Sequence, residues 1–178
     1  MSTNAIATRP FTLNYPHVFE PSAFNDEAPK YSIQMLFDKS DEDAIALLQR
    51  EITTAYNEGK YKLRGSNNGP VPPLAGIKTP LRDGDAEHPG NPVYEGKLFM
   101  NATSKFPPSV FDRARKSLTD QNAIYPGAVC RAGVSFSTYN MNGNRGISCL
   151  LHSIQKIADG DPIGARQSTG AEFDDFLD

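Results

Sequence analysis

The sequence contains no tryptophan and only two cysteines and three histidines among its 178 residues. Two cysteines cannot build a disulfide framework, and no spacing of histidine and cysteine resembles a zinc site. No apolar run approaches the ~20 residues of a membrane span, and residues 1–8 lack the charged start and apolar centre of a signal peptide. We therefore expect one cytoplasmic domain with a hydrophobic core and without metal or cofactor.

Acidic charge is concentrated at one end of the chain. The net charge is −3, which taken alone argues against a nucleic-acid-binding protein. Residues 158–178 hold six carboxylates and one arginine, a net charge of −5, which leaves 17 basic and 15 acidic side chains, or +2, in residues 1–157. This asymmetry predicts a mildly basic domain over residues 1–157 followed by a disordered acidic tail over residues 158–178.

Most of the periodic segments alternate as β-strands do. Strands are predicted over residues 9–19, 30–39, 97–105, 128–140 and 145–157. Pro16 removes a donor from the first strand, which should end, bulge or lie at an edge there. Asn142-Gly143 predicts a hairpin turn between the last two strands, and Cys130 and Cys149 fall in apolar runs typical of buried thiols.

One substantial helix is expected after Ser40, which we interpret as its N-cap, with Gly59 at its end. A second, short helix is expected over residues 109–118. Residues 59–96 hold six prolines and no periodic pattern, which indicates a long loop insertion, with a short strand around residues 77–81. Together these elements predict a mainly β fold, an OB-fold-like Greek-key barrel with long loops.

The strand over residues 97–105 carries the functional signal. Its core face holds Leu98, Met100 and Ala102, and its other face holds Lys97, Phe99, Asn101, Thr103 and Lys105. Two lysines around an aromatic ring suit phosphates and unpaired bases, which indicates single-stranded nucleic acid. The alternative is that Phe99 packs under a loop while both lysines are solvated.

Several segments in order resemble the phage-type single-stranded DNA-binding proteins. They are the Tyr15-Pro16-His17-Val18-Phe19-Glu20-Pro21 opening, the strand 31–37 that leads into the helix, the Lys97-Leu98-Phe99-Met100-Asn101 strand and the Tyr125-Pro126-Gly127-Ala128 turn. The resemblance covers residues 9–157. It implies an OB fold, sequence-tolerant coating and protection of single-stranded DNA during phage replication, recombination and repair, and work in the host cytoplasm.

The residues expected to contact DNA fall into three groups. Three cations on outward strand faces should neutralise phosphates: Lys97, Lys105 and Arg131. The amide of Asn101 is expected to contact DNA beside them. Phe99 and Tyr139 should stack on bases. Tyr31 and Phe37 are ranked second, because the strand face that they share resembles a core face. The third group lies in the long loop, which is either a mobile basic flap or a solvated loop that touches nothing. Its cations are Lys60, Lys62, Arg64, Lys78 and Arg82.

The end of the tail mixes acids with large apolar side chains, which suits docking into a basic-rimmed pocket of a partner protein. The resemblance implies that this partner is a replication or recombination protein. The residues of this tail end are Glu172, Phe173, Asp174, Asp175, Phe176, Leu177 and Asp178. The charge asymmetry also suggests that the tail lies against the basic groove when DNA is absent.

Other classes of protein are weaker fits. The segment Asp83-Gly84-Asp85-Ala86-Glu87-His88 offers oxygen ligands that a metal-dependent nuclease would need, without the full pattern of a calcium loop. His152 lies in an apolar strand and is interpreted as a core histidine. A non-catalytic structural or virion-associated β-barrel protein remains the second candidate. The sequence leaves open the oligomeric state, a homodimer included, and the choice between DNA and RNA.

Overall fold

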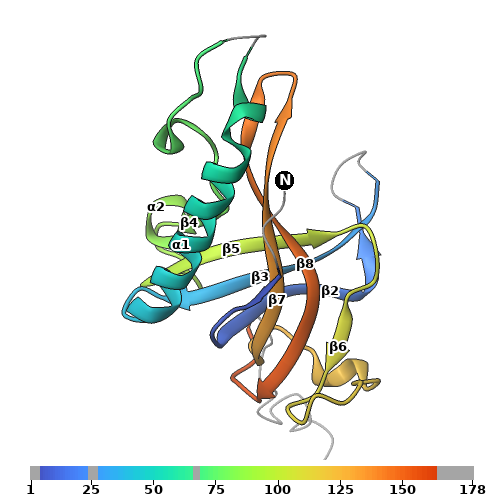
Figure 1. Ribbon diagram of the computed structural model, residues 1–178. Coiled ribbons are helices and arrows are strands. Elements are labelled where there is room, and N and C mark those ends of the chain that lie inside the picture. Colours follow the sequence, from blue (N-terminus) through green and yellow to red (C-terminus); the bar gives the residue numbers. More distant parts are fainter. Residues whose placement is uncertain (1–4, 24–27, 66–68, 164–178) are drawn as a thin grey trace, which may run out of the picture.

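The computed structural model describes residues 5–23, 28–65 and 69–163 (Figure 1). The acidic end at residues 172–178 lies outside this part of the chain. The strands are β1 (Ile6–Ala7), β2 (Phe11–Ser22), β3 (Lys30–Asp38), β4 (Leu81–Asp83), β5 (Lys97–Ser104), β6 (Ser109–Phe111), β7 (Val129–Met141) and β8 (Asn144–Ala158). The helices are α1 (Glu42–Gly59) and α2 (Gly84–Glu87), with the 3₁₀ turns η1 (Lys60–Leu63), η2 (Leu74–Gly76) and η3 (Gln121–Ala123).

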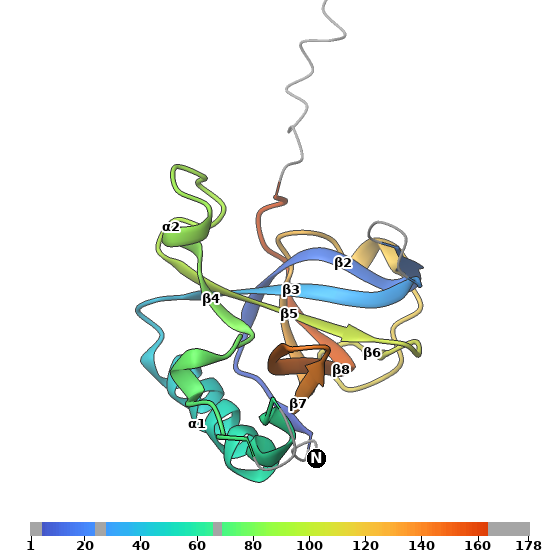
Figure 2. The ribbon, with the colours of Figure 1, turned by 90° about the horizontal axis from the view of Figure 1, so that it is seen from above.

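Five strands close into a ring in the order β2-β3-β5-β8-β7 and back to β2. Its antiparallel ladders join β2 to β3, β3 to β5, β7 to β8 and β7 to β2. The exception is the β5–β8 pair, which is parallel, with Thr103 opposite Leu150. Figure 2 shows the ring from above, with α1 outside it. This closed Greek-key ring confirms the predicted OB-like barrel.

The barrel interior is filled by the alternate residues that the strand patterns predict. Leu13, Ile33, Met35, Met100 and Phe136 are each less than 2 % exposed. The apolar stripe of α1 joins this core through Ala44, Leu48, Ile52 and Ala55. Burial of these side chains supplies the main driving force for the fold.

Helix α1 begins one residue later than predicted. Asp41, not Ser40, is the N-cap, and its Oδ1 accepts a hydrogen bond of 3.2 Å from the backbone N–H of Ala44. Glu42 and Asp43 then occupy the first turn, where the helix dipole favours negative charge.

The predicted hairpin between β7 and β8 is confirmed. Asn142 and Gly143 both have positive φ, 54° and 86°, which matches the twist of the flanking strands. The hairpin projects beyond the barrel beside α1 (Figure 1). Within its strands Cys130 and Cys149 are free and buried as predicted, and burial raises the pKa of the Cys130 thiol to about 12.

The strand β2 continues through Pro16 by means of a bulge. Asn14 pairs with Gln34 and His17 with Ser32, so three steps along β2 match two along β3. Tyr15, at the extra position, has φ 44°. The bulge is one of the outcomes expected at Pro16.

Two local predictions differ from the structure. Residues 59–96 are not a plain loop, because η1, η2, β4 and α2 lie within them. Residues 109–118 form no helix: Val110 pairs in parallel with Ile154 at the open edge of β8, and the chain folds back so that Leu118 N–H donates to the Val110 carbonyl. Pairing with this edge outweighs the weak helical pattern.

Candidate nucleic-acid interface

A groove of about 540 Å³ lies where the barrel meets the β7–β8 hairpin and the segment 78–82. Polar, charged and aromatic side chains from these elements line it, among them Lys78, Arg82, Asn101, Thr103, Tyr139 and Ser148. Four residues of the expected DNA contacts therefore share one hollow: Lys78, Arg82, Asn101 and Tyr139. Thr103, on the predicted outward face of β5, joins them.

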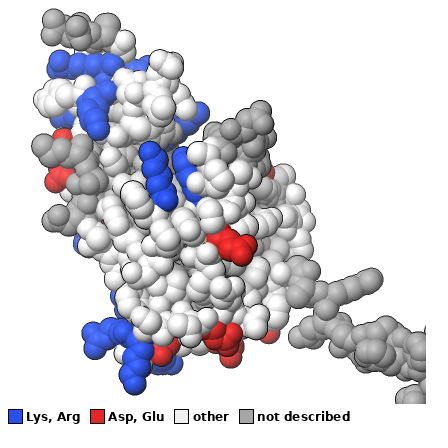
Figure 3. Space-filling view, turned by 90° about the vertical axis from the view of Figure 1, so that its right-hand side faces the viewer, with Lys and Arg blue, Asp and Glu red and all other residues white. Residues whose placement is uncertain are grey.

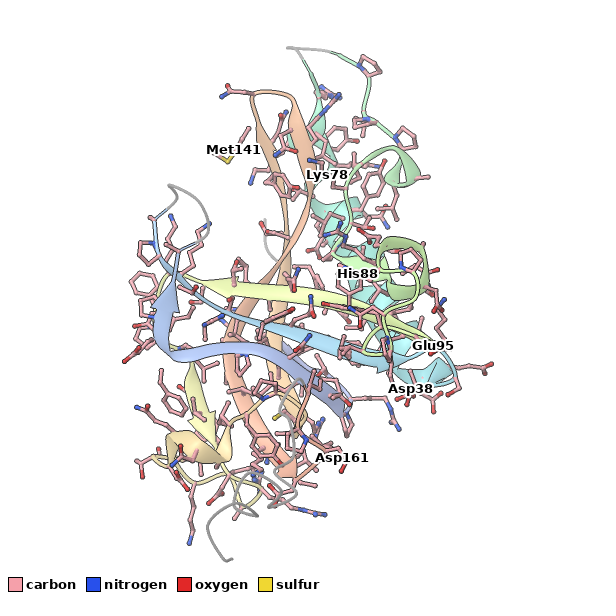
Figure 4. The ribbon with its side chains drawn as sticks, turned by 180° about the vertical axis from the view of Figure 1, so that it is seen from behind. Asp38, Lys78, His88, Glu95, Met141 and Asp161 are labelled. Carbon is pink, nitrogen blue, oxygen red and sulfur yellow. The ribbon has the colours of Figure 1, made fainter. Side chains whose placement is uncertain are left out.

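Backbone hydrogen bonds fix the segment 78–82 against the hairpin. The N–H of Lys78 donates to the carbonyl of Arg145 at 3.2 Å, and the carbonyl of Lys78 accepts from the N–H of Ile147 at 2.9 Å. Figure 4 shows Lys78 beside the hairpin on this side of the molecule. Strand β4 then pairs with β5, which places Arg82 opposite Phe99. The cations of this segment are thus held at the groove by the fold.

The two groove cations differ in their partners. Arg82 Nε donates to Glu87 Oε2 at 2.8 Å, and its Nη2 bonds the other carboxylate oxygen. The guanidinium also lies 5.4 Å from the centre of the Phe99 ring. Lys78 is exposed and forms no ion pair with any carboxylate in the described part of the chain. Lys78 is therefore free to meet a phosphate, whereas Arg82 must first leave Glu87.

The expectation that Phe99 presents an exposed ring is wrong. Its side chain is 2 % exposed, on the outer face of the sheet but covered by the segment 84–96. The ring packs edge-on against Tyr94 at 5.2 Å and lies 5.3 Å from the ring of His88. The alternative of a ring packed under a loop is confirmed, whereas its other part, two solvated lysines, holds for Lys105 and not for Lys97. Burial also raises the pKa of the Tyr94 hydroxyl.

Lys97 and Phe37 also have different surroundings from those expected. Lys97 forms an ion pair with Asp38 on the neighbouring strand, so its charge is already matched. Phe37 is 1 % exposed and packs on Phe11 at 5.6 Å between ring centres, which makes it a core residue without a face to offer a base. Tyr31, opposite Ser104 near the start of β3, is only partly buried.

The remaining expected cations lie outside the groove lining. Lys105 follows the end of β5 and is exposed. Arg131 lines a separate hollow of about 350 Å³ with Phe111 and Arg115, and its Nε donates to the Thr8 carbonyl at 2.8 Å. The expected single surface of Lys97, Lys105 and Arg131 is therefore not formed.

The first part of the predicted flap is packed on the hairpin. Asn140 Nδ2 donates to the carbonyls of Lys62 and Arg64, each at 3.0 Å, and Arg145 Nη1 donates to the Leu63 carbonyl at 2.8 Å. Lys60 begins η1 in the same stretch. The side chains of Lys60, Lys62 and Arg64 therefore extend from a backbone that is hydrogen-bonded to the hairpin. None of them lines the groove.

The carboxylates considered as metal ligands are held by a lysine instead. Lys39 Nζ lies 2.8 Å from Asp83 Oδ1 and 2.7 Å from Asp85 Oδ2. These hydrogen bonds lower the pKa of both carboxyl groups and raise the pKa of Lys39. Among the described residues no group of three or more His, Cys, Asp or Glu side chains is placed to hold a metal ion.

The interpretation of His152 as a core residue is wrong. It is exposed, and its Nε2 lies 2.7 Å from the Ser135 hydroxyl. No helix within the described ranges is both long and apolar enough to cross a membrane.

Charge on one face of the molecule is mixed. Figure 3 looks at the side on which β6 lies in Figure 1. Basic side chains stand at both ends of this face and in its middle, with acidic ones near the middle, at the lower end and at the upper left edge. The groove, by contrast, combines a ring, an amide, hydroxyl groups and two cations.

OB-like barrels are common among proteins that bind single-stranded nucleic acid, and the comparisons with known proteins place the chain in one such family. The family described as "Enterobacter phage Enc34, ssDNA-binding protein" matches residues 4–178. The chain therefore belongs to this family of phage single-stranded DNA-binding proteins, as its sequence patterns suggested.

Individual proteins are similar to the chain over most of its length. The chain is 34 % identical over 174 residues to the putative protein p50 of Acyrthosiphon pisum secondary endosymbiont phage 1, covering 92 % of this chain and 89 % of the relative. The structure of the bacteriophage Enc34 protein in complex with ssDNA matches with a TM-score of 0.74 at 24 % identity, covering 90 % of each chain. Bacteriophage T7 gp2.5, a single-stranded DNA-binding protein, matches with a TM-score of 0.67 at 13 % identity, covering 95 % of this chain and 93 % of gp2.5. The two structures share the fold.

Proposed function

We propose that this protein binds single-stranded DNA in the groove, with little sequence preference, and coats and protects the strand during phage replication, recombination and repair. The observation that carries the proposal is the meeting of Tyr139, Lys78 and Asn101 in one hollow beside the hairpin. A ring can stack on any base and a lysine can meet any phosphate, so the site needs no particular sequence. Membership of the family and the likeness to a fold solved with ssDNA support this assignment.

A salt titration tests the proposal. Binding of a thymidine oligonucleotide should quench tyrosine fluorescence, which is readable because the chain has seven tyrosines and no tryptophan. Each phosphate contact contributes roughly 0.7 to the slope of log affinity against log salt, so Lys78→Gln should lower the slope by about that amount. Lys116→Gln, in the turn after β6, is the control for loss of a surface charge and should leave the slope unchanged. Absence of quenching at low salt would favour the structural alternative, and shortening of the oligonucleotide with magnesium would indicate a nuclease.

The roles assigned to the tail rest on its sequence alone. We propose that residues 172–178 recruit replication or recombination proteins and that the acidic tail competes with DNA for the groove. The last described residues leave the barrel near its outer face, where Ile163 packs against the cluster of Leu36, Tyr94 and Phe99. A chain that ends at residue 163 should bind the oligonucleotide more tightly at low salt. Equal affinity of the two chains would exclude competition.

The place of work and the assembly follow as further proposals. We expect the protein to act in the cytoplasm of the bacterial host, where the DNA is. Gel filtration with and without an oligonucleotide would distinguish a monomer from a homodimer and would give the number of nucleotides bound per chain.

A further inference from the structure

Tyr15 is exposed at a position of β2 where the alternation of the strand predicts a buried side chain. Phe11 and Leu13 alternate inward and are 3 % and 0 % exposed, so regular alternation would bury Tyr15 as well. Instead its side chain is 61 % exposed. Val18, after the bulge, is again buried. The extra residue of the bulge therefore turns one ring from the core to the solvent.

The backbone at Tyr15 is in a conformation that a tyrosine rarely adopts. Its φ of 44° lies in the left-handed region, where the side chain of any residue other than glycine crowds the backbone. A glycine at this position would form the same bulge without that strain. Strain of this kind gathers at functional sites, and bulges often re-aim a side chain beside them. Folding gains nothing evident from the exposed ring.

The ring lies at the end of a polar row that starts in the groove. Asn101, which lines the groove, is paired with Gln34, and Gln34 is paired with Asn14, the residue before Tyr15. The three strands are each ~4.8 Å apart, so the row spans about 10 Å of the outer sheet face. The row is rigid, because Gln34 Oε1 accepts hydrogen bonds of 2.8 Å from both Asn14 Nδ2 and the Tyr94 hydroxyl. Gln34 and Asn14 are only 7 % and 4 % exposed, so the row holds the strands in register and offers the DNA no polar contacts beyond Asn101.

The backbone beside Tyr15 is held by its neighbours. Asn14, the residue before it, donates a hydrogen bond to Gln34 on β3. The Tyr15 side chain itself is 61 % exposed. An accessible ring on a paired strand meets the requirements of a stacking platform.

We propose that Tyr15 stacks on a base of the bound strand, and that the DNA leaves the groove across β5, β3 and β2 to reach it. This inference rests on the proposed function, since it extends the same binding surface. It assigns to the protein a second aromatic contact, on β2, in addition to Tyr139 on β7. The ligand at Tyr15 is an unpaired base of any identity, because every base has a face that can stack.

Three substitutions at the one position separate the explanations. Tyr15→Phe keeps the ring, Tyr15→Leu keeps apolar bulk and strain but not the flat face, and Tyr15→Gly removes both ring and strain. Binding is measured by anisotropy of an end-labelled thymidine oligonucleotide and of a strand of equal length without bases, and folding by the thermal midpoint. The phenylalanine variant should bind as the unchanged protein does. The leucine and glycine variants should lose roughly 5- to 150-fold in affinity for the thymidine strand and nothing for the abasic one.

The thermal midpoint supplies the second readout. Tyr15→Gly should unfold at the same temperature as the unchanged protein or a higher one, because relief of strain offsets the added freedom of the unfolded chain. Equal affinity of all variants, or an equal loss on the abasic strand, would overturn the stacking role. In either case Tyr139→Ala would still be impaired if the groove binds DNA, whereas failure of the unchanged protein to bind would refute the proposed function itself.

Discussion

The hydroxyl of Tyr139 lies 2.7 Å from the position that a Cβ atom on Gly146 would occupy, and the Lys78 carbonyl lies 2.6 Å from the same position. Only a residue without a side chain fits between the hairpin and the segment 78–82. Gly146 thereby allows a ring and a cation from separate elements to approach the same hollow. This close approach defines the geometry of the groove.

Gly146→Ala should impair folding and DNA binding together. The added methyl group must displace backbone at Lys78, which is expected to destabilise the protein by about 1–3 kcal/mol. The same shift would move Tyr139 and Lys78 and weaken binding of the oligonucleotide. Gly65→Ala is a matched control, since its nearest atom would lie at 3.7 Å, an ordinary contact. Denaturant unfolding and anisotropy would reveal whether the two effects occur in the same variant.

Tyr139→Ala should weaken binding of single-stranded DNA by about 1–3 kcal/mol through loss of base stacking. Tyr139→Phe retains the ring and should bind normally. The Tyr139 side chain is only partly buried, so the thermal midpoint of the alanine variant should change little. An alanine variant with normal affinity would remove Tyr139 from the interface.

Phe99→Ala should act on stability. The ring is 2 % exposed and packs between Tyr94, His88 and Leu36, so its removal is expected to cost about 3–5 kcal/mol of unfolding free energy. Urea unfolding of Phe99→Ala and Phe99→Leu would measure this cost, with the smaller loss for leucine. A fully stable alanine variant with weakened DNA binding would instead support the original expectation of an exposed stacking ring.

Glu87→Gln should strengthen binding at low salt. The substitution weakens the ion pair that holds Arg82, and a surface pair of this kind contributes ~0.2–1 kcal/mol. Arg82 would then meet a phosphate without first leaving a carboxylate. Glu95→Gln makes the same change of charge on the same segment and has no ion pair with the described residues. Equal gains from both variants would indicate a general charge effect without a role for Arg82.

The Lys39 ion pairs should make stability depend on pH. The pKa values of Asp83 and Asp85 are lowered in the folded protein from the ordinary value of 3.8, so their stabilising effect is present above that value. It is lost as the pH falls through the lower folded pKa values. Lys39, whose pKa is raised above 10.5, loses its contribution at still higher pH. Thermal midpoints of the unchanged protein and Lys39→Gln should converge at low pH and at high ionic strength, because all three groups are exposed. A constant difference would exclude these pairs.

Local patterns were sufficient to predict the barrel. The alternation of Ile33, Met35 and Phe37, the stripe of α1 and the Asn142-Gly143 turn depend on neighbours in the chain, and each is confirmed. The groove was predicted only in part, because Lys78 and Arg82 reach Tyr139 through pairing between distant segments. Phe99 was placed wrongly because no periodicity reveals that the segment 84–96 folds back over it. Tyr15 was missed as an exposed ring, although Pro16 was the signal that the strand bulges there.

The parallel pairing of β5 with β8, through Thr103 and Leu150, has a further consequence. The groove lies along the seam between β5 and β8, with Thr103 on one side and Ser148 on the other. The β5–β8 ladder is the shortest of the ladders that form the ring. A ligand bound there would contact both strands and hold them together. Amide hydrogens beside the seam should therefore exchange readily in the free protein and slow down most when an oligonucleotide is added.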